Sequence, residues 1–237
     1  MAKIVAANWK MNLRRQSACE LVSALKEEGR KCWLFPAFPL IGPVADTLIG
    51  SGMRLGAQDV SPEPDGAFTG DVSAEMLQDA GCELVLIGHS ERRHHHGESG
   101  ELLAAKLKRA AEGGLEAVYC VGETLNQRKA GKAQEVVREH LSTLAGAGKV
   151  AAVAYEPVWA IGTGETATPE QAEEMHALIR GELEKLGLKT PILYGGSVKP
   201  ENARELLAQP HVDGVLVGGA SLKLESLRAI DIAALES

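Results

Sequence analysis

Residues 150–157 read Val-Ala-Ala-Val-Ala-Tyr-Glu-Pro, in which a short apolar run is followed by the carboxylate of Glu156 and by Pro157. The run lacks the alternation of a half-solvated strand, which is typical of a parallel strand buried on both faces. Glu156 follows it directly, at a place where a charge is costly unless it is paired or functional. This stretch therefore predicts a buried strand that presents a working carboxylate at its end.

Similar apolar runs recur along the chain, with amphipathic patterns between them. We expect strands at 3–7, 32–35, 54–57, 84–87, 117–121, 150–155, 191–194 and 214–217, and the clearest helices at 102–112, 133–144, 169–186 and 200–208. Thr168 before Pro169, and Ser73 before residues 74–80, are typical helix N-termini. Strand–helix units without a linker predict an α/β fold, a (β/α)₈ barrel in a single domain over 1–237, with an open doubly wound sheet as the alternative.

The composition argues against several classes of protein. Hydrophobic residues make up 45% and charged residues 24% of the chain, as in soluble globular proteins. A net charge of −7 argues against a nucleic-acid-binding surface, which needs a basic stripe. There is no signal-peptide pattern and no apolar stretch near ~20 residues, so we expect neither export nor a membrane span.

The cysteines are widely spaced and form no C-x-x-C pair; they are Cys19, Cys32, Cys82 and Cys120. Each lies in or beside an apolar segment, where a buried thiol behaves as a small hydrophobe. We therefore expect reduced, structural cysteines and a cytoplasmic location.

Distinctive residues gather just after the ends of the expected strands. They are Asn8 and Lys10 after the first, His89 and Glu91 after the fourth, Glu156 after the sixth, Gly195-Gly196-Ser197 after the seventh and Gly218-Gly219 after the eighth. In a closed barrel all these strand ends lie at the same mouth, where active sites are built. We therefore expect them to form one site.

The two glycine pairs have the chemistry of an anion site. Glycine lets backbone N–H groups approach an anion without a Cβ in the way, and Ser197 adds a hydroxyl donor. A helix expected to begin near Ala220 would point its positive end at the same place. Either glycine pair alone fits a tight βα turn, but two pairs at adjacent strands indicate a phosphate site.

Three side chains at the other strand ends suit proton transfer beside a carbonyl. Lys10, unless it is a solvated surface charge, supplies a fixed positive charge for an enediolate. His89, unless it is only structural, lies near a helix start, which disfavours the imidazolium and leaves a neutral hydrogen-bond donor. Glu156, unless it forms a salt bridge to an arginine, is placed to act as a general base.

The residues after Glu156 have the composition of a hinged lid, with rigid apolar residues first and small ones after. The spacing Gly162-x-Gly164-x-x-Ala167 also matches a dinucleotide fingerprint. That fingerprint should follow a strand immediately, and here six residues intervene. We therefore expect no nucleotide cofactor.

The triplet His94-His95-His96 invites comparison with a metal site. Three consecutive side chains in a helix or strand cannot all face one ion, and no cysteine or carboxylate has the usual ligand spacing. We expect an exposed polar turn here and no metal.

Four motifs, in this order and spread over almost the whole chain, resemble the triosephosphate isomerase family. They are Asn8-Trp9-Lys10-Met11-Asn12, Gly88-His89-Ser90-Glu91-Arg92-Arg93, Tyr155-Glu156-Pro157-Val158-Trp159-Ala160-Ile161-Gly162-Thr163-Gly164 and Tyr194-Gly195-Gly196-Ser197-Val198. The resemblance implies a TIM-barrel isomerase without a cofactor. Such an enzyme interconverts dihydroxyacetone phosphate and D-glyceraldehyde 3-phosphate through an enediolate, in glycolysis and gluconeogenesis.

The resemblance also implies a role for each site residue. Glu156 is the base, neutral His89 polarises the carbonyl and handles oxygen-bound protons, and Lys10 with Asn8 stabilises negative charge on the phosphorylated triose. Glu91 positions Lys10. The residues implied to hold the phosphate are Gly162, Ser197, Gly218 and Gly219.

The loop Gly66-Ala67-Phe68-Thr69-Gly70 resembles the interdigitating loop of the family and implies a homodimer, in which Thr69 of one subunit steadies the Lys10 region of the other. Cys120 matches a cysteine on the fifth strand of the family and is expected to be structural. The chain departs from the family at Glu165, where a lysine is common, and in the histidine-rich stretch 94–96. Neither departure involves an expected catalytic residue.

Two other functions compete with this interpretation. The first is another phosphate-binding barrel, such as an aldolase or a different sugar-phosphate isomerase. A Schiff-base aldolase would need a lysine inside strands five to seven, and those strands have none. A phosphosugar-binding protein without catalysis would have lost Glu156 or His89, and both are present.

Overall fold

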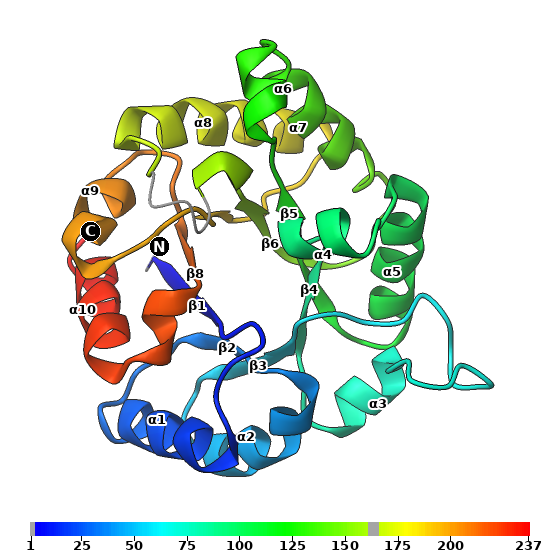
Figure 1. Cartoon of the computed structure of the whole chain (residues 1–237), viewed down its shortest axis with the longest axis vertical. Helices are drawn as coiled ribbons and strands as arrows, with labels where there is room; N and C mark the ends of the chain where they lie inside the picture. Colours follow the sequence, from blue (N-terminus) through cyan, green and yellow to red (C-terminus); the bar gives the residue numbers. More distant parts are fainter. Residues whose placement is uncertain (1–2, 161–165) are drawn as a thin grey trace.

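The computed structural model describes residues 3–160 and 166–237, and its centre is a closed barrel of parallel strands (Figure 1). The strands are β1 (Ile4–Asn8), β2 (Trp33–Phe35), β3 (Arg54–Ala57), β4 (Leu84–Ile87), β5 (Glu116–Val121), β6 (Val150–Tyr155), β7 (Ile192–Tyr194) and β8 (Gly214–Val217). Each strand pairs with its neighbours in sequence, and β1 pairs with β8 to close the ring. The predicted (β/α)₈ barrel is confirmed, and the open doubly wound sheet is excluded.

Helices form the outer layer around the strands (Figure 1). The α-helices are α1 (Arg15–Glu27), α2 (Ile41–Leu48), α3 (Ala74–Asp79), α4 (Ser90–His95), α5 (Gly100–Glu112), α6 (Leu125–Lys129), α7 (Ala133–Ser142), α8 (Pro169–Lys185), α9 (Pro200–Leu207) and α10 (Leu224–Leu235). Short 3₁₀ turns occur at η1 (Phe38–Leu40), η2 (Val158–Ala160) and η3 (Gly219–Leu222).

The predicted helix starts at Ser73 and Thr168 are confirmed by their capping bonds. Ser73 Oγ accepts a hydrogen bond from the backbone N–H of Met76 at 3.1 Å, and Thr168 Oγ1 accepts one from Gln171 at 3.2 Å. The helix expected near Ala220 is present as the short 3₁₀ helix η3, which is separate from α10. Residues 219–222 form a tight 3₁₀ turn, the chain then becomes extended at Lys223, and α10 begins only at Leu224.

Both faces of the strands are buried, as their continuous apolar runs predicted. One cluster fills the inside of the barrel, and its members are Ala6, Phe35, Leu84, Leu86, Val118, Cys120, Ala152, Ala154, Leu193 and Leu216. The alternate residues of the same strands pack outward against the helices. Gly56 makes room for the largest of the inner side chains, since a Cβ on Gly56 would lie 2.3 Å from the ring of Phe35.

All four cysteines lie in the described part of the chain as free thiols. Burial raises the pKa of Cys32 and of Cys82 to about 12, and it raises the pKa of Cys120 well above its usual range. These three thiols therefore stay protonated and pack as apolar groups. Within residues 3–160 and 166–237, no helix combines the length and apolar character needed to cross a membrane.

Candidate active site

A cavity of about 480 Å³ opens at the carboxyl ends of the strands. Nine of the predicted site residues line it; they are Asn8, Lys10, His89, Glu156, Gly195, Gly196, Ser197, Gly218 and Gly219. Glu91 does not line the cavity but contacts Lys10 from outside it. Gly162, predicted to bind phosphate, and Glu165, where the chain departs from the family, lie outside the described residues.

Lys10 is fixed at the end of β1 in an unusual backbone conformation. Its φ of 52° lies in the left-handed region, which costs a non-glycine residue about 1–3 kcal/mol unless the surroundings enforce it. Asn8 Oδ1 accepts a hydrogen bond from the Lys10 backbone N–H at 2.9 Å, and Gln58 Nε2 donates to the Lys10 carbonyl at 2.8 Å. The Lys10 ammonium then donates to Glu91 Oε1 at 2.6 Å. The ammonium is therefore held in one place at the mouth.

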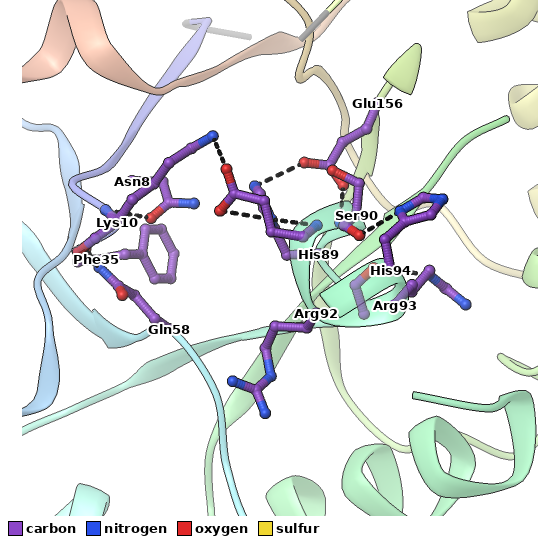
Figure 2. A network of polar contacts seen from close by, with 12 residues as sticks. Asn8, Lys10, Phe35, Gln58, His89, Ser90, Arg92, Arg93, His94 and Glu156 are labelled. Carbon is purple, nitrogen blue, oxygen red and sulfur yellow. Dashed lines mark hydrogen bonds and ion pairs between the residues drawn. The ribbon is translucent and has the colours of Figure 1, made fainter. Parts of the chain in front are cut away.

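The carboxylate of Glu156 is buried and held by two donors. Glu156 Oε2 accepts a hydrogen bond from the backbone N–H of Ser90 at 2.8 Å, and Glu156 Oε1 lies 2.9 Å from His89 Nε2. Figure 2 shows these contacts joining the end of β6 to the start of α4. The alternative of a salt bridge to an arginine is wrong, because the partners are a histidine and a backbone amide.

His89 is the N-cap residue of α4, so it lies at a helix start as the sequence predicted. Its Nδ1 accepts a hydrogen bond from the backbone N–H of Glu91 at 3.3 Å, so in the neutral ring the proton sits on Nε2 and faces Glu156. Burial lowers the pKa of His89, but the charge and hydrogen bond of Glu156, with Glu91, outweigh it and raise the pKa above 6.5. The contact with Glu156 therefore favours the protonated ring, against the expectation of a neutral imidazole.

The predicted phosphate side of the cavity is made by the turns after β7 and β8. None of Gly195, Gly196, Gly218 and Gly219 has a positive φ, so left-handed turn geometry does not explain these glycines. A Cβ on Gly195 would lie 3.0 Å from Glu156 Cγ, and one on Gly196 would lie 2.3 Å from the hydroxyl of Tyr194. The first pair is therefore required by close packing beneath the site, whereas Gly219 faces open space.

Comparison with known proteins agrees with this geometry. The triosephosphate isomerase family model matches residues 3–234 of the chain. The chain belongs to the triosephosphate isomerase family. The triosephosphate isomerases of Xanthomonas euvesicatoria pv. vesicatoria and of Stenotrophomonas maltophilia strain K279a are each 50% identical to it, over 98% of both chains.

In this triosephosphate isomerase family member, sequence reasoning missed Glu123, which follows β5. Its side chain is fully buried, and its Oε1 accepts hydrogen bonds from Trp159 Nε1 at 2.9 Å, Tyr155 Oη at 3.1 Å and Arg128 Nη1 at 3.1 Å. Glu123 thus anchors η2, the turn that follows Glu156. The signal was present, because Glu123 follows an apolar strand much as Glu156 does.

Gln58 and Ser90 were also missed as site residues of this isomerase. Gln58 donates to the carbonyls of both Lys10 and Phe35, and Ser90 acts on Glu156 only through its backbone N–H. A backbone donor carries no side-chain signature, so the sequence could not reveal the role of Ser90.

The histidine triplet lies away from the cavity, on the last turn of α4 and just beyond it. All three side chains are exposed, and His94 Nδ1 lies 2.6 Å from the Ser90 carbonyl (Figure 2). Within residues 3–160 and 166–237, no three His, Cys, Asp or Glu side chains come together as metal ligands.

Proposed function

We propose that this isomerase interconverts dihydroxyacetone phosphate and D-glyceraldehyde 3-phosphate by proton transfer through an enediolate, in glycolysis and gluconeogenesis. The observation that carries the proposal is the meeting of Glu156, His89 and Lys10 from three separate strand ends around one cavity. A carboxylate base, an imidazole donor and a fixed cation are the groups that this reaction requires.

Glu156 is the base that moves the proton between neighbouring carbons. In the structure its two oxygens are occupied by Ser90 and His89. The carboxylate must leave these donors and turn into the cavity to reach a carbon-bound proton. Its burial supports this role, because a buried carboxylate can meet the substrate without a layer of bulk water between them.

His89 polarises the substrate carbonyl through Nε2–H. The bond from Glu91 N–H to Nδ1 fixes the tautomer that carries the proton on Nε2. When Glu156 turns away, the main influence that raises the His89 pKa is withdrawn, and burial and Lys10 then favour the neutral ring. When Glu156 leaves this contact, its carboxylate is therefore free to accept a proton from the substrate, and His89 Nε2–H is free to donate to the substrate carbonyl.

Lys10, supported by Asn8 and positioned by Glu91, stabilises the negative charge that develops on the substrate oxygens. The phosphate is held by backbone N–H groups at Gly218, Gly219 and Ser197, and by Gly162 in the lid. Gly219 lines the cavity at the start of η3, and the first backbone N–H groups of a helical turn are suited to bind an anion. Glu123 supports this arrangement by holding the hinge side of the lid through Trp159.

The chain acts as a single domain over 1–237 and as a cytoplasmic homodimer without cofactor or metal. The loop of residues 66–70 follows β3 in a long excursion that projects from the barrel (Figure 1). Phe68 in this loop is 44% exposed, and Met11, next to Lys10, is 92% exposed. Large apolar side chains in such positions suit burial against a second copy. Thr69 of one subunit then steadies the Lys10 region of the other.

The test is isomerisation of dihydroxyacetone phosphate by the purified chain, with a chelator and without added cofactor. We expect multiple turnovers. Failure to turn over, together with tight binding of a phosphorylated two-carbon acid, would instead assign the cavity to a phosphosugar-binding protein.

A further inference from the structure

Two lysines stand on the phosphate side of the cavity rim, one before each of two helices. Lys199 precedes α9, and Lys223 precedes α10. Both line the cavity, and both are exposed. Within residues 3–160 and 166–237, neither ammonium forms an ion pair, so each charge remains available to an approaching anion.

The charges deeper in the cavity do not attract a dianion from a distance. The ammonium of Lys10 is 2.6 Å from Glu91, and Glu156 adds a further negative charge beside it. The chain as a whole carries a net charge of −7. A phosphate dianion therefore approaches a molecule of net negative charge, in which the Lys10 ammonium is already paired with Glu91.

Screening makes the nearby rim charges decisive. At physiological salt the Debye length is about 8 Å, so distant carboxylates are largely screened while charges at the rim still act on a ligand at the mouth. The backbones that carry both lysines are ordered: Lys199 N–H donates to Asn202 Oδ1 at 2.8 Å, and Lys223 is extended at the start of α10. The lysine heads stay mobile in water, which suits capture over a range of approach directions.

We propose that Lys199 and Lys223 form an electrostatic entrance that captures the phosphate group and guides it to the backbone donors at Gly218 and Gly219. The proposal rests on the proposed function and adds the residues that set the rate of substrate capture. The lysines do not touch the reacting carbons, so they act on kcat/KM and leave kcat unchanged. Glu201 lines the same rim and opposes them.

The test compares two double variants that lower the net charge equally. Lys199→Gln/Lys223→Gln removes the entrance, and Lys31→Gln/Lys189→Gln removes two exposed lysines just before β2 and β7, at the opposite end of the barrel. At about 0.01 M ionic strength we expect kcat/KM to fall about tenfold in the first variant and less than twofold in the second. At about 0.3 M the first variant should come within about twofold of the parent.

Two further variants separate charge from structure. Lys199→Arg/Lys223→Arg keeps the charge and should retain kcat/KM within about twofold, whereas Glu201→Gln should raise kcat/KM at low salt. The proposal would be overturned if kcat/KM fell equally in the rim variant (Lys199→Gln/Lys223→Gln) and the control variant (Lys31→Gln/Lys189→Gln). It would also be overturned if the fall in kcat/KM of the rim variant did not become smaller at higher salt.

A measurement without turnover keeps this inference separate from the proposed function. Inorganic phosphate is titrated against each variant, and its dissociation constant is followed by phosphorus NMR at both salt concentrations. Weaker phosphate binding in the rim variant at low salt, but not in the control variant, supports the entrance even if the parent does not isomerise. Equal phosphate affinity in both variants contradicts it.

Discussion

Glu156 Oε1 lies 2.9 Å from His89 Nε2, so the proposed base and the proposed electrophile are in direct contact before any substrate arrives. The contact satisfies both buried groups and also blocks both from the chemistry. In the proposed mechanism, substrate binding must therefore break this contact before Glu156 and His89 can act on the substrate.

The first prediction concerns the pH dependence of this contact. Because the pKa of folded His89 is raised above 6.5, its contribution to stability is complete below pH 6.5 and is lost as the pH rises through the raised pKa. His89→Gln removes the titration but keeps a donor toward Glu156. We expect the parent to have the higher melting temperature, with a larger difference between parent and variant at pH 6 than at pH 8.5. A difference that does not change with pH would show that Glu156 does not raise the pKa of His89.

The second prediction concerns the fully buried His176 and the half-buried His140. Burial lowers the pKa of His140 and of His176 to about 4 in each case. Between pH 6.5 and 4 these two histidines are therefore protonated in the unfolded chain but remain neutral in the folded chain. Stability is therefore lost as the pH falls toward 4, by up to about 1.4 kcal/mol per pH unit for each histidine. Denaturant unfolding of His140→Gln/His176→Gln should show a flatter decline between pH 6.5 and 4.5 than the parent, and an equally steep decline would refute this source of acid sensitivity.

A third prediction concerns the histidine triplet, whose side chains are exposed on the last turn of α4 and beyond. Replacing His94, His95 and His96 with Gln, Tyr and Phe should leave turnover within a few-fold of the parent. Steady-state kinetics and metal analysis check this. A large loss of activity, or stoichiometric zinc that depends on these residues, would show that the triplet has a function we have not assigned.

The fourth prediction concerns the lid. Its residues 161–165 lie outside the part of the chain that the structure describes. An enediolate can either be reprotonated or expel phosphate and collapse to methylglyoxal, and a closed lid opposes the second route by gripping the phosphate and excluding water. Shortening residues 161–166 should slow isomerisation and raise the phosphate released per isomerisation event. An unchanged ratio would mean that this segment only assists binding.

Much of the fold was predictable because its signals are local. Continuous apolar runs mark buried parallel strands, Ser73 and Thr168 mark helix starts, and closure of the barrel brings Lys10, His89 and Glu156 to one mouth. Most of the predicted residues that line the cavity could be identified from their positions just after the strand ends.

The contacts that set the chemistry were less predictable because they join distant parts of the chain. The bond from Gln58 to the Lys10 carbonyl and that from Ser90 N–H to Glu156 depend on side-chain and backbone positions fixed only by packing. The close approach of Tyr194 explains Gly196 better than any turn type does. Sequence reasoning therefore predicted which side chains meet at the cavity and missed the contacts that hold Lys10 and Glu156 in place.

The fifth prediction concerns Glu156 itself. Glu156→Gln is nearly isosteric but cannot accept a carbon-bound proton, so it should keep the fold and phosphate binding and lose nearly all turnover. Glu156→Asp retracts the carboxylate by ~1 Å and should lose on the order of 10²-fold or more in activity. Turnover near the parent rate in the glutamine variant would remove Glu156 from the role of base.

The most direct measurement of the central claim is isomerisation of dihydroxyacetone phosphate in deuterium oxide, with a chelator and with the product trapped as it forms. Transfer by Glu156 through an enediolate predicts deuterium at C2 of D-glyceraldehyde 3-phosphate in the parent, detected by NMR, and no such product from Glu156→Gln. Product from Glu156→Gln that carries deuterium at C2 and forms at a rate near that of the parent would contradict proton transfer by Glu156.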